Sequence, residues 1–285
     1  MSATQPNSRA LGALGVGAAA AGRATRLRLR GPGLQRLISP VVLLILWQLI
    51  HVFNLVSVKK LPPPTTVLST AWNLITTNEP AYGTLQGALG ASLERMVIGF
   101  ALGAGVALIL ALVSGLSRWG ENTFDPILQM IRTVPLFGLV PVFIVWFGIG
   151  ELPKILLIAL AALIPLYLNA FAGIRGVDHR LWELADVLGL SRSERLRHVI
   201  LPGALPQTLV GLRLSLGTAW LALVVAEQVN TNAGLGYMIN QATQFLSNNV
   251  IFVALAVYTI LGLATDWLVR LLERRALAWR RGLLT

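Results

Sequence analysis

Six long runs of hydrophobic residues alternate with shorter polar segments, at approximately 37–57, 93–116, 124–149, 153–174, 206–227 and 249–270. A helix of about 20 apolar residues can cross the roughly 30 Å hydrocarbon core of a membrane. The pattern therefore predicts an all-α integral membrane fold with six transmembrane helices. Pro135 and Pro141 in the third run, and Pro165 in the fourth, predict kinked helices packed in a bundle. Small residues of the second run predict close helix packing: Gly99, Gly103 and Gly105.

The composition supports a membrane protein. Hydrophobic residues make up 55% of the 285 residues, charged residues only 12%, and the mean hydropathy is +0.70. Soluble domains carry about 25% charged residues. The net charge of +11 comes largely from arginines beside the apolar runs. This placement favours anionic lipid headgroups over nucleic acid as the basic side chains' partner.

Catalytic and metal-binding motifs are missing from the sequence. The chain has no cysteine, and its three histidines, His51, His179 and His198, lack the spacing of metal ligands. None of its lysines follows a glycine, so there is no phosphate-binding loop for ATP. Ser191 lies near His198, but a helix cap explains it better than a hydrolase site. The sequence predicts no catalytic residue, no metal and no cofactor bound by this chain.

The arginines also predict the orientation in the membrane, because positive residues concentrate on the cytoplasmic side. Arginine groups precede the first run, lie between the fourth and fifth, and follow the sixth, whereas the opposite side holds only Lys59, Lys60, Arg95 and Lys154. Both termini are therefore predicted to be cytoplasmic. Residues 1–36 are predicted to be a disordered basic tail, because their charge follows the apolar part, unlike in a signal peptide. Residues 37–275 then form the transmembrane domain, and 276–285 form a cytoplasmic C-terminal tail.

A proline-rich segment separates the first two runs on the predicted outer side. Its prolines require an extended entry, after which Pro64 is well placed to begin a helix. Apolar residues then recur near helical spacing, which predicts an amphipathic helix lying in the membrane interface: Val67, Ala71, Leu74 and Ile75.

The segment from Gly176 to Pro202 predicts two short helices on the cytoplasmic side. Asp178 caps the first, Gly189 ends it, and Ser191 with Glu194 forms a capping box for the second. Pro202 is expected to stop the second helix before the fifth run. Each helix has an apolar face: Leu181, Leu184, Ala185 and Leu188, then Leu196, Val199 and Ile200. Periodicity alone leaves open whether a cytoplasmic protein or the lipid headgroups cover this pair.

This segment resembles the EAA motif of ABC-importer permeases, which is E-A-A, three residues, G, nine residues, and I-x-L-P. The matching residues are Glu183, Ala185, Gly189, Val199, Leu201 and Pro202, with Leu184 in place of the first alanine and valine in place of isoleucine. The segments LPPPTTVLSTAW, PLFGLVPVFIVWFGIGELPKILLIAL and VVAEQVNTNAGLGYMI extend the resemblance to the nitrate, sulfonate and taurine branch. Aliphatic sulfonate permeases are the most similar members, over about residues 37–280.

The resemblance implies the type I ABC importer fold, in which this loop is a coupling helix pair docked on a separate ATPase. It implies two ATPase subunits carrying ATP and Mg, a second copy of this chain, and an extracytoplasmic substrate-binding protein. The location implied is the bacterial cytoplasmic membrane. The resemblance places these residues at the ATPase contact: Glu183, Ala185, Asp186, Gly189, Leu190, Ser191 and Arg192. Val199, Leu201 and Pro202 end the coupling loop.

Polar residues inside the runs are candidates for the transport pathway or its gate, because charge inside a membrane is costly and often functional. Arg132 precedes the two prolines of the third run and either assists an anion or stabilises the bundle. Glu227, Gln228 and Asn230 form a polar group at the outer end of the fifth run. A carboxylate repels an anion, so Glu227 is interpreted as structural or gating.

Other functions explain the sequence less well. A secondary carrier predicts inverted repeats, which are not visible, and leaves the cytoplasmic helix pair unexplained. A membrane enzyme requires convergent catalytic groups at one face. An ABC permease for taurine, nitrate, bicarbonate or a pyrimidine precursor remains open, because no residue of this sequence specifies the cargo.

Overall fold

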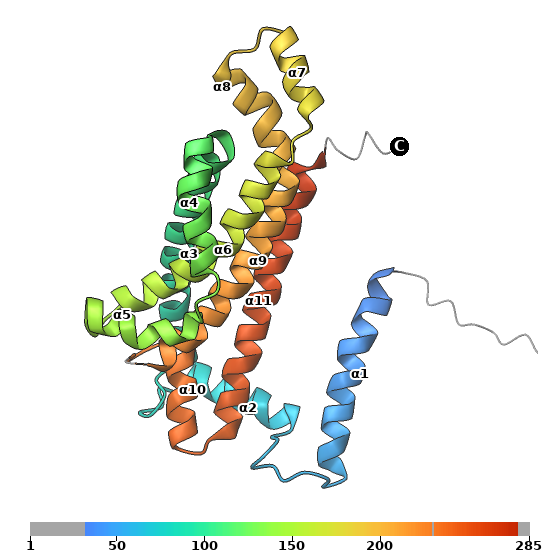
Figure 1. Ribbon diagram of the computed structural model, residues 1–285. Coiled ribbons are helices and arrows are strands. Elements are labelled where there is room, and N and C mark those ends of the chain that lie inside the picture. The colour runs from blue at the N-terminus through green and yellow to red at the C-terminus, as the bar shows by residue number, and fades with distance from the viewer. Residues whose placement is uncertain (1–31, 230, 279–285) are drawn as a thin grey trace, which may run out of the picture. The chain divides into compact units, whose positions relative to one another are not determined.

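The computed structural model describes residues 32–229 and 231–278, and those residues are almost entirely helical (Figure 1). The predicted tail of residues 1–36 lies largely outside the described residues, and so does most of the predicted tail of residues 276–285. The elements are α1 (Pro32–Val52), α2 (Pro64–Thr76), α3 (Leu85–Leu116), α4 (Arg118–Ile131), η1 (Leu136–Gly138), α5 (Leu139–Phe147), α6 (Leu152–Arg175), α7 (His179–Val187), α8 (Arg192–Arg195), η2 (Leu196–Ile200), α9 (Leu201–Gln228), α10 (Leu235–Gln244) and α11 (Asn248–Ala276). Within α1 the chain divides after Ile45 into two compact units, and the description below concerns the second.

The helices α3, α6 and α9 form the centre of the bundle, with α6 packed against both of the others. Four continuous helical segments of the described residues are long and apolar enough to cross a membrane: α3, α6, α8 through α9, and α11. The pair α4–α5 adds a fifth span if it is counted as one bent helix. The remaining predicted span corresponds to α1, whose apolar part, Ile38–Val52, is shorter. The predicted all-helical membrane fold is therefore confirmed, with a less uniform set of spans than the sequence suggests.

The largest difference from the prediction lies in the third run, where the structure has a break in place of a kink. The α4 helix ends at Ile131 and α5 begins at Leu139, and the two parts meet at 80°. Pro135 explains the position of the break, because proline offers no N–H and disfavours helical geometry in the preceding residue. Pro165 instead stays inside a continuous α6.

Glycines let α3 and α6 approach closely. A Cβ atom on Gly103 would lie 2.1 Å from the carbonyl oxygen of Ala159, and one on Gly99 would lie 2.8 Å from Ile158. The packing predicted for these two glycines is therefore confirmed. A Cβ on Gly105 would meet nothing within 4 Å, so this glycine does not serve the contact.

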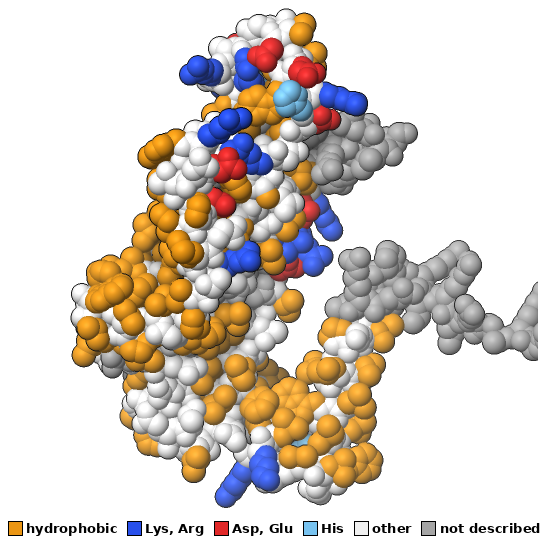
Figure 2. All heavy atoms as spheres, in the orientation of Figure 1, with side chains coloured by type: hydrophobic (Ala, Val, Ile, Leu, Met, Phe, Trp, Pro, Cys, Tyr) orange, Lys and Arg blue, Asp and Glu red, His pale blue; other side chains and the backbone are white. Residues whose placement is uncertain are grey.

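The two ends of the bundle differ in character. At one end lie α7, α8 and the C-terminal end of α11, and at the other lie α2 and α10 (Figure 1). Charged side chains gather around the α7–α8 end, whereas hydrophobic side chains cover most of the visible remainder (Figure 2). The predicted helix after the proline-rich segment is confirmed as α2, which buries Val67 and Leu74 against α10 and α11.

Candidate functional site

The first helix of the predicted coupling loop (residues 176–202, called the coupling loop below) is held by its cap and one small buried side chain. The carboxylate of Asp178 accepts the N–H of Arg180 at 3.0 Å and so caps α7, as predicted. Ala185 is 1% exposed, and Trp182 packs on the cluster around Ile174 and Ile200. Of the four residues in the predicted apolar face of this helix, only Ala185 is buried, so the face as a whole does not pack against the bundle. Apolar side chains of α7 are instead left at the surface: Leu181, Leu184, Val187 and Leu188.

The turn after α7 has the geometry of a helix end that requires glycine. Gly189 has φ +66°, in the left-handed region. Its N–H donates to the Asp186 carbonyl at 3.0 Å, and the Leu190 N–H donates to the Ala185 carbonyl at 3.0 Å. This is the Schellman arrangement, in which two carbonyls at the helix end are satisfied by the residues that leave it. Asp186 also pairs with Arg195 at 2.7 Å, so the first helix is tied to the second.

The second helix begins as predicted but ends differently. Ser191 and Glu194 form the predicted capping box, with the Ser191 N–H donating to the Glu194 carboxylate at 2.8 Å. The prediction that Pro202 stops this helix is wrong, because α8, the π turn η2 and α9 follow without a gap. In the π turn, the N–H of Leu201 reaches back to the carbonyl of Leu196. This wider spacing accommodates a proline one residue later, where an α-helical hydrogen bond is not required.

Of the seven predicted contact residues, five are exposed at the tip of the bundle, whereas Ala185 is buried and Leu190 is half-buried. Glu183, Asp186, Gly189, Ser191 and Arg192 are exposed there, beside the uncovered side chains of Leu184 and Leu188. The later motif residues lie further back: Val199 is half-buried, and Leu201 and Pro202 belong to the start of α9. The tip thus offers apolar and charged groups on a turn that its caps make rigid. Such a surface can transmit the movement of a partner because little of the movement is lost in the loop.

At the opposite end, Glu227 is the centre of a charge cluster that is buried apart from Glu151 and is defined here as Ser92, Arg95, Glu151, Lys154, Glu227 and Tyr258. Glu227 is 1% exposed. Its carboxylate accepts hydrogen bonds from Arg95 Nη1 at 2.7 Å, Ser92 Oγ at 2.8 Å and Tyr258 Oη at 3.0 Å. It therefore joins α3, α9 and α11, and its environment favours the predicted structural or gating role over direct contact with an anion.

The same carboxylate caps the start of α10. The Gly236 N–H donates to Glu227 at 2.9 Å, and the Leu235 N–H donates to Ser92 Oγ at 2.9 Å. Negative charge is favourable at a helix N-terminus because the first N–H groups have no partner within the helix. A Cβ on Gly234 would lie 2.6 Å from the Glu227 carboxylate, so only glycine allows this approach. The glycine-rich sequence after the fifth run is thus explained by packing.

The outer part of the charge cluster was not predicted from the sequence. Glu151 lies between α5 and α6 and contacts both Arg95 and Lys154, the latter at 3.0 Å. The hydrogen bond from Arg95, followed by that from Lys154, lowers the pKa of Glu151 to about 2. The three-residue spacing of Glu151 and Lys154 was the one available signal. The contact with Arg95 depends on the packing of α3 beside α6.

The remaining pathway candidates are scattered. Arg132 is exposed at the C-cap of α4 and has no carboxylate partner in the described residues. Gln228 is exposed at the end of α9, and its carbonyl accepts a hydrogen bond from Asn240. Asn230 lies outside the described residues. The structure does not bring Arg132 together with Glu227, and a pathway role for these residues stays a prediction.

Bent apolar helices around a buried charge cluster, with a capped helix pair at one end, define a multi-pass membrane protein. A family model described as "Binding-protein-dependent transport system inner membrane component" matches residues 99–277. The chain belongs to this family, and it is the permease subunit of an ABC importer. The permease subunits of this family are the non-catalytic, membrane-spanning part of the transporter.

Individual relatives match along most of the chain. It is 47% identical over 244 residues to the aliphatic sulfonates transport permease protein SsuC of Bacillus subtilis (strain 168). This match covers 86% of this chain and 87% of that protein. SsuC of Escherichia coli (strain K12) is 45% identical over 84% of this chain and 89% of that protein. The taurine transport permease TauC of the same strain is 37% identical over 84% of this chain and 86% of that protein.

Among solved structures, an amino acid ABC transporter crystallised with histidines has a similar fold. Its TM-score is 0.55 at 20% identity, covering 73% of this chain and 96% of that one. This similarity concerns the fold alone.

Proposed function

We propose that this permease carries aliphatic sulfonates across the cytoplasmic membrane of a bacterium, with both termini in the cytoplasm. The observation that supports this cargo most is the 47% identity to SsuC, against 37% to the taurine permease, at similar coverage. Taurine is itself an alkanesulfonate that carries an amino group, so it is the nearest alternative cargo.

Two partner ATPase subunits, each holding ATP and Mg, supply the energy. They dock on the tip of the coupling loop, where Gly189 turns the chain and Leu184 and Leu188 remain uncovered. Two copies of the permease then form a homodimer around the pathway, because each copy contributes one coupling loop. An extracytoplasmic binding protein delivers the cargo at the α2–α10 end.

The mechanism is alternating access. Closure of the two ATPases on ATP pushes the coupling loops, and the rigid caps at Asp178 and Ser191 pass this movement to α6 and α9. The pathway then opens outward to receive the cargo, and it opens inward after hydrolysis. The movement of the ATPases thus becomes a change in the packing of the bundle.

The test is uptake of labelled butane-1-sulfonate by proteoliposomes that contain this chain, its ATPase and its binding protein. We expect uptake that requires ATP and the binding protein. Uptake of taurine in preference to butane-1-sulfonate would make taurine the cargo and leave the importer function unchanged. Failure of the ATPase to associate with the permease at all would contradict the coupling assignment.

A further inference from the structure

Arg95 and Lys154 are two buried cations that share one exposed carboxylate. Arg95 is 7% exposed and Lys154 is 6% exposed, whereas the side chain of Glu151 is 55% exposed. Glu151 Oε1 accepts hydrogen bonds from Lys154 Nζ and from Arg95 Nη2, each at 3.0 Å. In the part of the chain that the structure describes, this carboxylate is the charged partner of Lys154.

The charges of the cluster balance only while Glu151 stays in place. Glu227 is fixed by hydrogen bonds from α3, from α11 and from the start of α10, so it remains paired with Arg95. If Glu151 turned away, the two cations and Glu227 would leave one uncompensated positive charge in a buried place. An unpaired buried charge is costly, so the site would then favour a ligand with a single negative charge.

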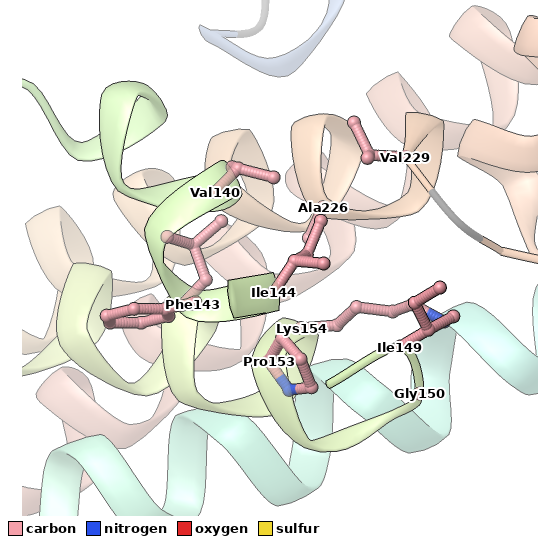
Figure 3. Close-up of a pocket in the computed structure, with 10 residues that line it drawn as sticks. Val140, Phe143, Ile144, Ile149, Gly150, Pro153, Lys154, Ala226 and Val229 are labelled. Atoms are coloured by element: carbon pink, nitrogen blue, oxygen red, sulfur yellow. The ribbon is translucent and has the colours of Figure 1, made fainter. Parts of the chain in front are cut away.

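An apolar pocket adjoins Lys154. Its walls come from Val140, Phe143 and Ile144 of α5 and Ala226 of α9 (Figure 3), together with Leu157 of α6. A charged side chain at the edge of an apolar pocket is suited to a ligand with an anionic head and a short alkyl chain. The cavity is only about 10 Å³ in this conformation, about the space that one water molecule needs. A ligand therefore enters only when the pocket widens.

The connections of α5 allow such widening. Val140 is the one buried residue of this helix, and Trp146 and Val145 at its far end are exposed. The helix follows the break at Pro135 and is joined to Glu151 through Gly148, whose φ of +78° lies in the left-handed region. Movement of α5 away from α6 would separate Val140 from Leu157 and Ala226, the buried residues on which it packs. Glu151 itself stays at the N-cap of α6, where its carbonyl accepts the Ile155 N–H at 3.1 Å, and its carboxylate, with a side chain 55% exposed, has room to turn toward solvent.

We propose that Arg95 and Lys154 form a binding site for a monoanion with a short alkyl chain, and that Glu151 occupies this site when no ligand is bound. The ligand's anionic oxygens replace the Glu151 carboxylate at Arg95 Nη2 and Lys154 Nζ, and its alkyl chain enters the pocket under α5. The assignment of the ligand as an alkanesulfonate rests on the proposed function. The site gives the permease a chemical preference of its own, in addition to that of its binding protein.

The absence of native cysteine allows a direct test. Ile149→Cys places a single thiol at the pocket edge, where Ile149 is 78% exposed, and Val145→Cys places one on α5 outside the pocket, where Val145 is 81% exposed. The rate of maleimide labelling is measured in nanodiscs that contain the permease and its ATPase. We expect butane-1-sulfonate to slow labelling of the Ile149→Cys protein and not of the Val145→Cys protein. Sulfate, which lacks the alkyl chain, and butan-1-ol, which lacks the charge, protect less.

Two substitutions then separate an anion site from an ion-pair network that only stabilises the fold. Lys154→Gln removes a charged hydrogen-bond donor, so the half-protecting concentration of butane-1-sulfonate should rise about tenfold or more, with partial recovery in Lys154→Arg. Glu151→Gln removes the competing carboxylate, so the half-protecting concentration should fall. A purely structural network moves both variants in the same direction, and that result would overturn the proposal. The absence of protection in the Ile149→Cys protein would overturn it as well.

Uptake by the complete transporter distinguishes a failure of the site from a failure of the proposed function. If butane-1-sulfonate slows labelling of the Ile149→Cys protein but is not taken up with ATP, the binding site is supported and the assignment of the cargo is wrong. If the Lys154→Gln transporter takes up butane-1-sulfonate at the rate of the wild type, the importer function is supported and the proposed binding site is wrong. The thermal midpoint of each variant in detergent, measured beforehand, confirms that the helices are folded.

Discussion

Replacement of Gly189 by alanine tests how far the coupling loop depends on one backbone conformation. A Cβ atom at Gly189 would meet nothing within 4 Å, so the substitution creates no clash within the permease. The cost comes from the φ of +66°, because a left-handed conformation costs a residue with a Cβ about 1–2 kcal/mol. Valine costs more, since branching at Cβ disfavours this region further.

The strain at residue 189 is expected to weaken binding of the ATPase. A penalty of about 1–2 kcal/mol changes the population of the native turn by about 5–30-fold. If the turn relaxes, the apparent affinity of the ATPase falls by up to the same factor, because only the native turn is competent to dock. We expect sulfonate uptake to fall accordingly in Gly189→Ala and to be abolished in Gly189→Val. Gly189→Asn should retain most activity, since asparagine tolerates the left-handed region.

The assay is a titration of the ATPase onto permease in nanodiscs, followed by uptake in proteoliposomes. Gly83 provides the matched control, because its φ is +72° and a Cβ there also meets nothing within 4 Å. Gly83→Ala carries the same strain at the opposite end of the bundle and should leave ATPase affinity unchanged. Binding of the ATPase to Gly189→Ala as tightly as to wild type would refute the role of this turn, and so would equal weakening in Gly83→Ala.

Three further predictions concern the bundle and its charge cluster, each measured by thermal unfolding in detergent. Gly103→Ala should lower stability by about 1–3 kcal/mol by separating α3 from α6, whereas Gly105→Ala, with open space around its Cβ, should raise it by up to about 1 kcal/mol. Equal changes in stability for Gly103→Ala and Gly105→Ala would contradict the close contact of α3 and α6 at Gly103. Glu227→Gln should lower the free energy of unfolding by about 3–5 kcal/mol, because it removes the negative charge paired with buried Arg95. Tyr258→Phe removes only one hydrogen bond and should lower it by about 1 kcal/mol. The pKa of Glu151 is lowered to about 2, chiefly by the Arg95 hydrogen bond. Its contribution, about 1 kcal/mol after solvent screening, is therefore present above its ordinary pKa of 4.5 and lost as the pH falls toward about 2. The stability difference between wild type and Glu151→Gln should disappear over that range, and a difference that persisted at the acid end would contradict the ion pairing.

The local features of the coupling loop were predictable because they depend on neighbours in sequence. Asp178 as a cap, Gly189 as a helix end and Ser191 with Glu194 as a capping box all involve residues within a few positions of one another. Hydrogen bonds of this range are specified by residue type and spacing. The continuation of the helix through Pro202 was not predictable, because it depends on a π turn whose Ile200 is buried in a cluster with Ile174 of α6 and Ala204 of α9.

The break between α4 and α5 shows an intermediate case. Pro135 marks its position in the sequence, but proline in a membrane helix produces either a kink or an interruption. Pro165 lies in a similarly apolar run and leaves α6 continuous. Which outcome occurs depends on whether neighbouring helices satisfy the freed carbonyl groups, and this is a property of the packed bundle.

The sequence by itself determined the class of this protein: the length and hydrophobicity of its runs require membrane helices, and short-range capping specifies the coupling loop. Only the tertiary structure decided the charge cluster. Arg95, Glu151 and Glu227 come from segments far apart in the chain, and hydrophobicity does not encode which helices become neighbours. In this protein that choice depends on close contacts such as Gly103 against Ala159, which bring α3 beside α6 and so place Arg95 within reach of its carboxylates.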